Sequence, residues 1–137
     1  MDVFDVAKRS QVMSRIRSCG NKTTELRFIL LLRKLNIRGW RRSVKLPGMP
    51  DFVFKEDTLA VFIDGDFWHG NPRNFRMPTT NQAYWRQKIE RNRRRDKAVN
   101  MLLRAKGWKV VRIWESHLKN AEMRVAQRLV ALLQSSP

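Results

Sequence analysis

The chain has 137 residues, and its 29 Lys and Arg against 12 Asp and Glu give a formal charge of +17. This excess predicts a polyanionic partner, and the spread of basic residues from Lys8 to Arg128 favours nucleic acid over a membrane surface. The sequence has no run of 18 apolar residues, no signal-peptide pattern and only one cysteine, Cys19, so we expect a cytosolic protein without an internal disulfide or a cysteine-rich zinc site.

The N-terminal half predicts an arm, one helix and three strands. We expect residues 1–20 to form an arm and residues 21–137 to form a single domain. The first helix should begin near Thr23 or Thr24, either of which could cap it, and should end before Gly39. Period-two and apolar patterns then predict strands at 40–46, 51–54 and 59–63, the last two joined as a hairpin by the turn at 55–57.

The C-terminal half predicts a long helix, a strand and a last helix. The long helix should run over 81–106 and stop at Gly107, and residues 108–114 should form the fourth strand. We expect Asn120 to cap the last helix, which should reach about Leu133. The order α-β-β-β-α-β-α predicts an α/β domain.

One face of the long helix should form a stripe that points inward, with its members alternately four and three residues apart. Its members are Trp85, Ile89, Asn92, Asp96, Val99 and Leu103. Because a buried amide or carboxyl group needs hydrogen-bond partners, we expect Asn92 and Asp96 either to bond neighbouring segments, which is the favoured reading, or to face the active-site end of the sheet.

Candidate metal ligands lie at the ends of the two hairpin strands. Asp51 follows Pro50 at the start of one strand, and it is either a turn-forming residue or a ligand for Mg²⁺, which prefers carboxylate and carbonyl oxygens. Where the other strand ends, the main-chain carbonyl of Ile63 could join Asp51, and Asp64 is a second candidate carboxylate. This arrangement is typical of a metal-dependent nuclease.

Two further groups are candidates for supporting the reaction. The common nuclease pattern places a Lys after the second acid, but Asp66 stands there, so His69 is the candidate general base, although an isolated histidine is more often structural. Glu25 in the first turn of the first helix either interacts with the helix dipole or supports the metal from its outer shell.

Aromatic and basic side chains suggest how nucleic acid would be held. Phe67, Trp68 and Trp85 are either core residues or wedges between base pairs. The long helix carries a dense basic segment, which is either a solvated face or, as we favour, a track for phosphates. The residues of this segment that we expect to contact phosphates are Lys88, Arg91, Arg94 and Arg95.

Several motifs, in order along almost the whole chain, resemble the very-short-patch repair (Vsr) mismatch endonucleases. They are Met13-Ser14-Arg15-Ile16, Thr24-Glu25, Leu46 to Val53, Phe62 to Gly70, Trp85 to Ile89, Asn92, Arg95-Asp96 and Gly107-Trp108 through Trp114-Glu115. The resemblance implies a restriction-endonuclease-like core, a mixed four-stranded sheet flanked by helices, and nicking of one DNA strand beside the T of a T:G mismatch left by deamination of 5-methylcytosine. Two alternatives stay open, a nicking or restriction enzyme for unmismatched DNA and an inactive mismatch-binding protein.

The resemblance also implies roles for individual residues. Asp51 and the carbonyl of Ile63 would bind Mg²⁺, His69 would be the base or orient the water, and Glu25 would act through water. Phe67, Trp68 and Trp85 would enter DNA from the major-groove side, and Met13 from the minor-groove side. Implied partners are T:G-mismatched double-stranded DNA, mismatch-repair proteins and a cytosine-5 methyltransferase system, with a monomeric protein and no membrane contact.

The chain departs from the family at a structural zinc site. Family members usually hold this zinc with cysteines at positions that here read Asp66, Asn71 and Ser116. None of these side chains is a thiolate, so we predict that structural zinc is absent. We expect the three side chains to form a hydrogen-bonded cluster instead, which would tie the loop after the second hairpin strand to the end of the fourth strand.

Overall fold

The computed structural model describes residues 22–66, 71 and 77–134. Its elements in chain order are α2 (Lys22–Lys34), β1 (Trp40–Arg41), β2 (Phe52–Phe54), β3 (Leu59–Asp64), α3 (Gln82–Ala105), β4 (Lys109–Trp114), α4 (Glu115–Asn120) and α5 (Glu122–Gln134). The predicted arm, residues 1–20, lies outside the described residues. None of the helices in the described part of the chain is long and apolar enough to span a bilayer.

The sheet is mixed and four-stranded, as predicted, and the structure shows its strand order to be β1-β2-β3-β4. The strands β2 and β3 pair antiparallel, with Phe54 opposite Leu59 and Phe52 opposite Val61, so the predicted hairpin is confirmed. The strands β3 and β4 run parallel in the register that sets Ile63 beside Ile113. Since α3 connects these parallel strands, the second half of the sheet is a β-α-β unit.

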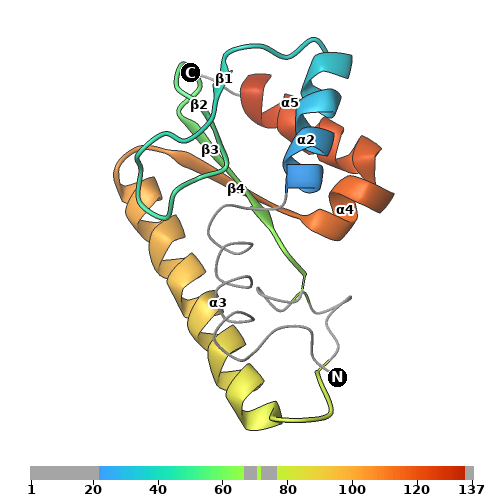
Figure 1. Cartoon of the computed structure of the whole chain (residues 1–137). Coiled ribbons are helices and arrows are strands. Elements are labelled where there is room, and N and C mark those ends of the chain that lie inside the picture. The colour runs from blue at the N-terminus through green and yellow to red at the C-terminus, as the bar shows by residue number, and fades with distance from the viewer. Residues whose placement is uncertain (1–21, 67–70, 72–76, 135–137) are drawn as a thin grey trace.

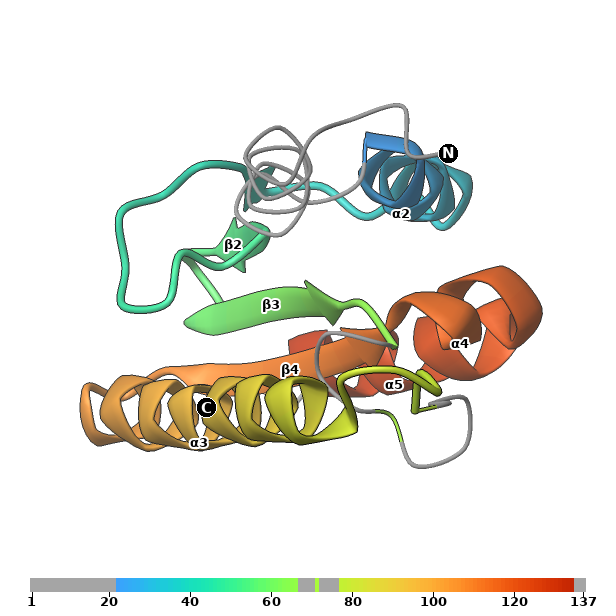
Figure 2. The ribbon, with the colours of Figure 1, turned by 60° about the horizontal axis from the view of Figure 1, so that its bottom comes forward.

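Helices cover both faces of this sheet (Figures 1 and 2). On one face, α2, α4 and α5 pack onto alternate residues of β2, β3 and β4 and bury the larger core cluster, which includes Phe28, Leu32, Phe52, Phe54 and Leu129. On the other face, Leu103 of α3 packs against Ala60 and Phe62 of β3. The α/β class is therefore confirmed, and both faces of β3 are buried.

The inward stripe of α3 is confirmed. Ile89, Asn92 and Leu103 are buried, and the other members, Trp85, Asp96 and Val99, are partly buried. Val99 also explains a glycine in the loop before β2, because a Cβ on Gly48 would lie only 2.5 Å from Cγ1 of Val99, and Gly48 has a φ of +78°. Only glycine meets both requirements, so this loop can lie close against α3 and lead the chain to Asp51.

The first predicted strand is too long. The strand β1 ends at Arg41, and Ser43 has a φ of +56°, which turns the chain away from the sheet before Leu46. The alternating pattern of residues 40–46 therefore continues beyond the point at which the backbone leaves the sheet.

The first helix begins earlier than predicted. Because α2 already includes Lys22, Thr23 and Thr24 lie inside it and do not cap it. Oγ1 of Thr24 instead donates to Oε1 of Glu115, 2.7 Å away.

The prediction for the C-terminus missed one helix. Residues 115–120 form α4, so Asn120 ends this helix instead of capping α5. The N–H of Ala121 donates to the carbonyl of His117 at 2.7 Å, which closes the last turn of α4. Leu118 is buried in the larger core cluster, and this packing stabilises a short helix that local preference alone would not.

Candidate active site

Asp51 and Ile63 meet where β2 and β3 leave each other. Oδ2 of Asp51 accepts a hydrogen bond from the N–H of Ile63 at 2.7 Å. If the β2–β3 register continued beyond Phe52, Pro50 would stand opposite Ile63, and proline has no N–H to donate to the Ile63 carbonyl. The Pro-Asp pair therefore ends the ladder, and the Asp51 carboxylate takes the place that a backbone carbonyl would have occupied.

This junction suits a hard divalent cation. In an antiparallel strand the N–H and C=O of one residue point to the same neighbouring strand, so the Ile63 carbonyl is directed to the side on which Asp51 lies. Among the residues that the structure describes, no three His, Cys, Asp or Glu gather as a metal-binding group. Mg²⁺ is often held by one or two carboxylates and keeps several waters, so one carboxylate and one carbonyl fit it.

The pKa of Asp51 also supports a cation site at this junction. Burial raises the pKa of Asp51 from 3.8 to about 6, the hydrogen bond from Ile63 opposes this rise, and the nearby charges of Glu25 and Asp64 add to it. The positive charge of Arg112 lowers the pKa. A carboxylate that lacks sufficient positive charge around it is a group that a bound cation would stabilise.

The raised pKa predicts how stability depends on pH. Because the folded protein holds the Asp51 proton more tightly than the unfolded chain, the free energy of unfolding without metal should fall as pH rises from about 4 to about 6, by at most about 3 kcal/mol. Urea unfolding in EDTA across this range would measure the change, and Asp51→Asn should flatten it. A variant whose profile stayed parallel to that of the wild type would contradict the assignment.

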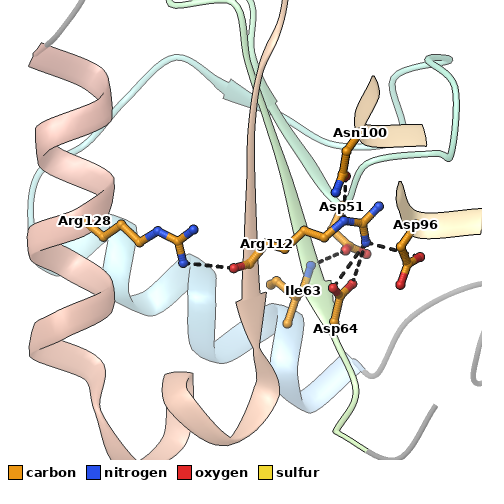
Figure 3. A network of polar contacts seen from close by, with 7 residues as sticks. All are labelled: Asp51, Ile63, Asp64, Asp96, Asn100, Arg112 and Arg128. Carbon is orange, nitrogen blue, oxygen red and sulfur yellow. Dashed lines mark hydrogen bonds and ion pairs between the residues drawn. The ribbon is translucent and has the colours of Figure 1, made fainter. Parts of the chain in front are cut away.

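Asp64 lies beside this junction but is paired with Arg112 (Figure 3). Nη1 of Arg112 lies 3.0 and 3.2 Å from the two carboxylate oxygens of Asp64. Sequence analysis did not single out Arg112. The sequence nevertheless indicates its pairing, since an arginine between Val111 and Ile113 in an apolar strand requires a buried partner.

Glu25 is held near the junction by α2. Its carboxylate forms an ion pair with Arg42, and its side chain is 12% exposed whereas that of Arg42 is 46% exposed. Thr24, the preceding residue, is bonded to Glu115 at the start of α4. The start of α2 is therefore tied to the start of α4, and Glu25 lies close enough to Asp51 to raise the pKa of Asp51.

The structure brings together Asp66, Asn71 and Ser116, the three residues expected to form a hydrogen-bonded cluster. Oδ1 of Asp66 accepts hydrogen bonds from Nδ2 of Asn71 at 2.9 Å and from Oγ of Ser116 at 3.0 Å. The N–H of Asn71 also donates to the carbonyl of Asp66 at 2.8 Å. Asn71 is 2% exposed, so these bonds link the segment after β3 to the start of α4 at a buried point.

Comparison with known proteins identifies the family. The sequence model described as DNA mismatch endonuclease Vsr matches residues 1–74. The chain is 33% identical to DNA mismatch endonuclease Vsr of Escherichia coli K12 over 134 residues, which cover 97% of this chain and 85% of that protein. The chain belongs to the Vsr family.

Other relatives of this Vsr-family chain bear a different name. It is 38% identical to Type II nicking enzyme V.NmeDIP of Neisseria meningitidis serogroup C over 118 residues, which cover 85% of this chain and 79% of that enzyme. A match to Type II nicking enzyme V.NaeI of Lentzea aerocolonigenes is 53% identical over 66 residues, but it spans only 48% of this chain and 40% of that enzyme.

Some residues of this Vsr-family chain that are predicted to contact DNA or to act in catalysis lie on α3, and others lie outside the described residues. Met13, Phe67, Trp68 and His69 lie outside them. On α3, Trp85 is partly exposed and stacks edge-on against Tyr84, with ring centres 5.0 Å apart.

The basic segment of the Vsr-family helix α3 faces outward. Arg91, Arg94 and Arg95 are exposed, and Lys88 is partly exposed, with its Nζ 5.7 Å from the centre of the Tyr84 ring. A shallow hollow of about 360 Å³ lies on this helix and is lined by Arg86, Gln87, Glu90, Arg91 and Arg94. This outer face therefore presents cations together with hydrogen-bonding groups.

Proposed function

We propose that this Vsr-family chain is a Mg²⁺-dependent DNA endonuclease that nicks one strand beside the T of a T:G mismatch. The observation that carries the proposal is the junction at which the Asp51 carboxylate accepts the N–H of Ile63 and the ladder ends at Pro50. Membership of a family described as DNA mismatch endonucleases supports the substrate. The charge of +17 supports a nucleic-acid partner.

The chain's own residues would prepare the reaction in distinct ways. Asp51 and the Ile63 carbonyl would hold Mg²⁺, which offsets negative charge on the phosphate and on the leaving oxygen. The Ile63 N–H fixes the orientation of the Asp51 carboxylate. Glu25 would orient water near this site, and His69 is the proposed acceptor of the proton from the attacking water, because histidine is the residue type best suited to this role near neutral pH.

DNA recognition would combine phosphate contacts with insertion at the mismatch. The exposed arginines of α3 would bind phosphates, which determine position and not sequence. Trp85 on the same helix, with Phe67 and Trp68 from one groove and Met13 from the other, would wedge beside the mismatch. Unstacking costs less at a mismatch than in matched DNA, so insertion itself would contribute selectivity.

Nicking of unmismatched DNA is the second candidate function. The names of V.NmeDIP and V.NaeI describe Type II nicking enzymes without mention of a mismatch, so relatives of this chain leave this function open. A mismatch-binding protein without activity is the third, and the junction of Asp51 with Ile63 argues against it. The favoured function would place the protein in the cytoplasm, acting as a monomer beside mismatch-repair proteins and a cytosine-5 methyltransferase.

A supercoiled plasmid carrying one T:G pair separates these functions. Mismatch nicking predicts conversion to the open circle in Mg²⁺, no linear product, no reaction in EDTA, and a stable supercoiled form of the matched plasmid. Equal relaxation of both plasmids would establish the second function. Retarded migration of the mismatched duplex without relaxation would establish the third.

A further inference from the structure

Arg112 of β4 is surrounded by side chains from β3 and α3 (Figure 3). Its Nη1 donates to both oxygens of Asp64, and the same atom lies 3.4 Å from Oδ1 of Asp96. Its Nε donates to Oδ1 of Asn100 at 2.8 Å. The guanidinium carbon lies 4.1 Å from the centre of the Phe62 ring. Contacts on several sides of one planar group therefore fix its position.

The pair of Arg112 and Asp64 is shielded from water. The Arg112 side chain is 18% exposed and that of Asp64 is 7% exposed. A guanidinium presents its donors in a rigid plane, so it suits a carboxylate on one edge and an amide oxygen on another better than a lysine would. Nη1 of Arg128 donates to the Arg112 carbonyl at 3.1 Å, so the backbone at this position is also held.

The pair lies where it affects a cation. Asp64 directly follows Ile63, whose carbonyl is directed to the side of Asp51, and the Asp64 charge reaches Asp51. A divalent cation beside Asp51 would attract the Asp64 carboxylate as well. Arg112 competes for the same two carboxylate oxygens.

We propose that Arg112 is a positioning residue that holds Asp64 away from the cation bound by Asp51 and the Ile63 carbonyl. This inference rests on the proposed function, since it presumes a cation at Asp51. The number of carboxylates that reach a cation sets both its affinity and the number of waters it keeps. Asp96 and Asn100 hold the guanidinium from the α3 side, so the helix that carries the phosphate-binding arginines shares an anchor with the metal site.

Terbium luminescence on the full metal-free chain tests the proposal without reference to activity. Tb³⁺ is a probe for hard oxygen sites, and its emission lifetimes in H₂O and D₂O count its bound waters. In Arg112→Met, Asp64 should join the ion, so Tb³⁺ should bind about tenfold more tightly and lose about one water relative to the wild type. The Arg112→Met/Asp64→Asn double variant should restore the wild-type affinity and water count.

The water count separates coordination by Asp64 from the mere loss of a positive charge. Tighter binding of Tb³⁺ with an unchanged number of waters in Arg112→Met would overturn the proposal, and so would unchanged affinity. If Arg112→Met does not fold by circular dichroism, Arg112→Lys takes its place, because it keeps the charge but lacks the planar donors, and it should also lose water from Tb³⁺. Failure of the proposed metal site is distinguished by Asp51→Asn in the wild-type background, which would then leave Tb³⁺ affinity unchanged.

Discussion

Asp51→Asn should nick mismatched DNA about a hundredfold to a thousandfold more slowly than the wild type while still binding the duplex. Asparagine matches the size of Asp51 and can accept the N–H of Ile63, so the junction should keep its shape. It carries no charge to hold a cation or to repel a phosphate. Single-turnover nicking and fluorescence anisotropy of the same labelled duplex measure the two effects separately.

Asp57→Asn is the matched control for this substitution. Asp57 lies in the turn of the same hairpin, between β2 and β3, away from the junction of Asp51 with Ile63. The Asp57→Asn substitution removes the same charge as Asp51→Asn, and this variant should nick DNA at the wild-type rate. Nicking by Asp51→Asn at the rate of Asp57→Asn would remove Asp51 from the metal site, and loss of DNA binding by Asp51→Asn would indicate misfolding instead.

Arg91→Ala/Arg94→Ala should weaken DNA binding by about tenfold or more and make it less dependent on salt. Both arginines are exposed on α3 and line the same hollow. Each phosphate contact that is lost removes about one released counterion, so the slope of log affinity against log salt should become shallower by about two. Anisotropy titrations between low and moderate salt concentrations measure this slope.

The control for the arginine pair is Lys119→Ala/Arg124→Ala. It removes the same charge from exposed positions on α4 and α5, which cover the other face of the sheet. If DNA lies along α3, this control should change the slope by much less. Equal changes in the two double variants would show that the protein attracts DNA through its total charge and that α3 is not a specific track.

The hairpin and its acid were predictable because their signals are local. Apolar runs on either side of a polar turn determine β2 and β3, and a proline directly before Asp51 marks where the ladder must stop. The cluster of Asp66, Asn71 and Ser116 could also be anticipated, since three hydrogen-bonding residues occupy positions at which the family resemblance implies cysteines. The structure shows the hydrogen bonds that join these side chains, which their spacing in the sequence does not predict.

The features that sequence analysis missed depend on distant contacts. The strand β1 is short because Ser43 adopts a left-handed conformation, which its residue type does not indicate. The helix α4 exists because Leu118 meets the core that α2 and α5 build. Arg112 pairs with Asp64, 48 positions away in the chain, and only the parallel register of β3 and β4 brings the two together.

The most direct test of mismatch nicking is a competition between two duplex pools with randomised base pairs on both sides of one central pair. One pool carries T:G at the centre and the other carries T:A, and the strand with the T is end-labelled. Random flanks remove the need to know the recognised sequence. We predict Mg²⁺-dependent cutting at one position beside the T in the T:G pool, with the T:A pool intact; equal cutting of both pools, or cutting of neither, would contradict the account.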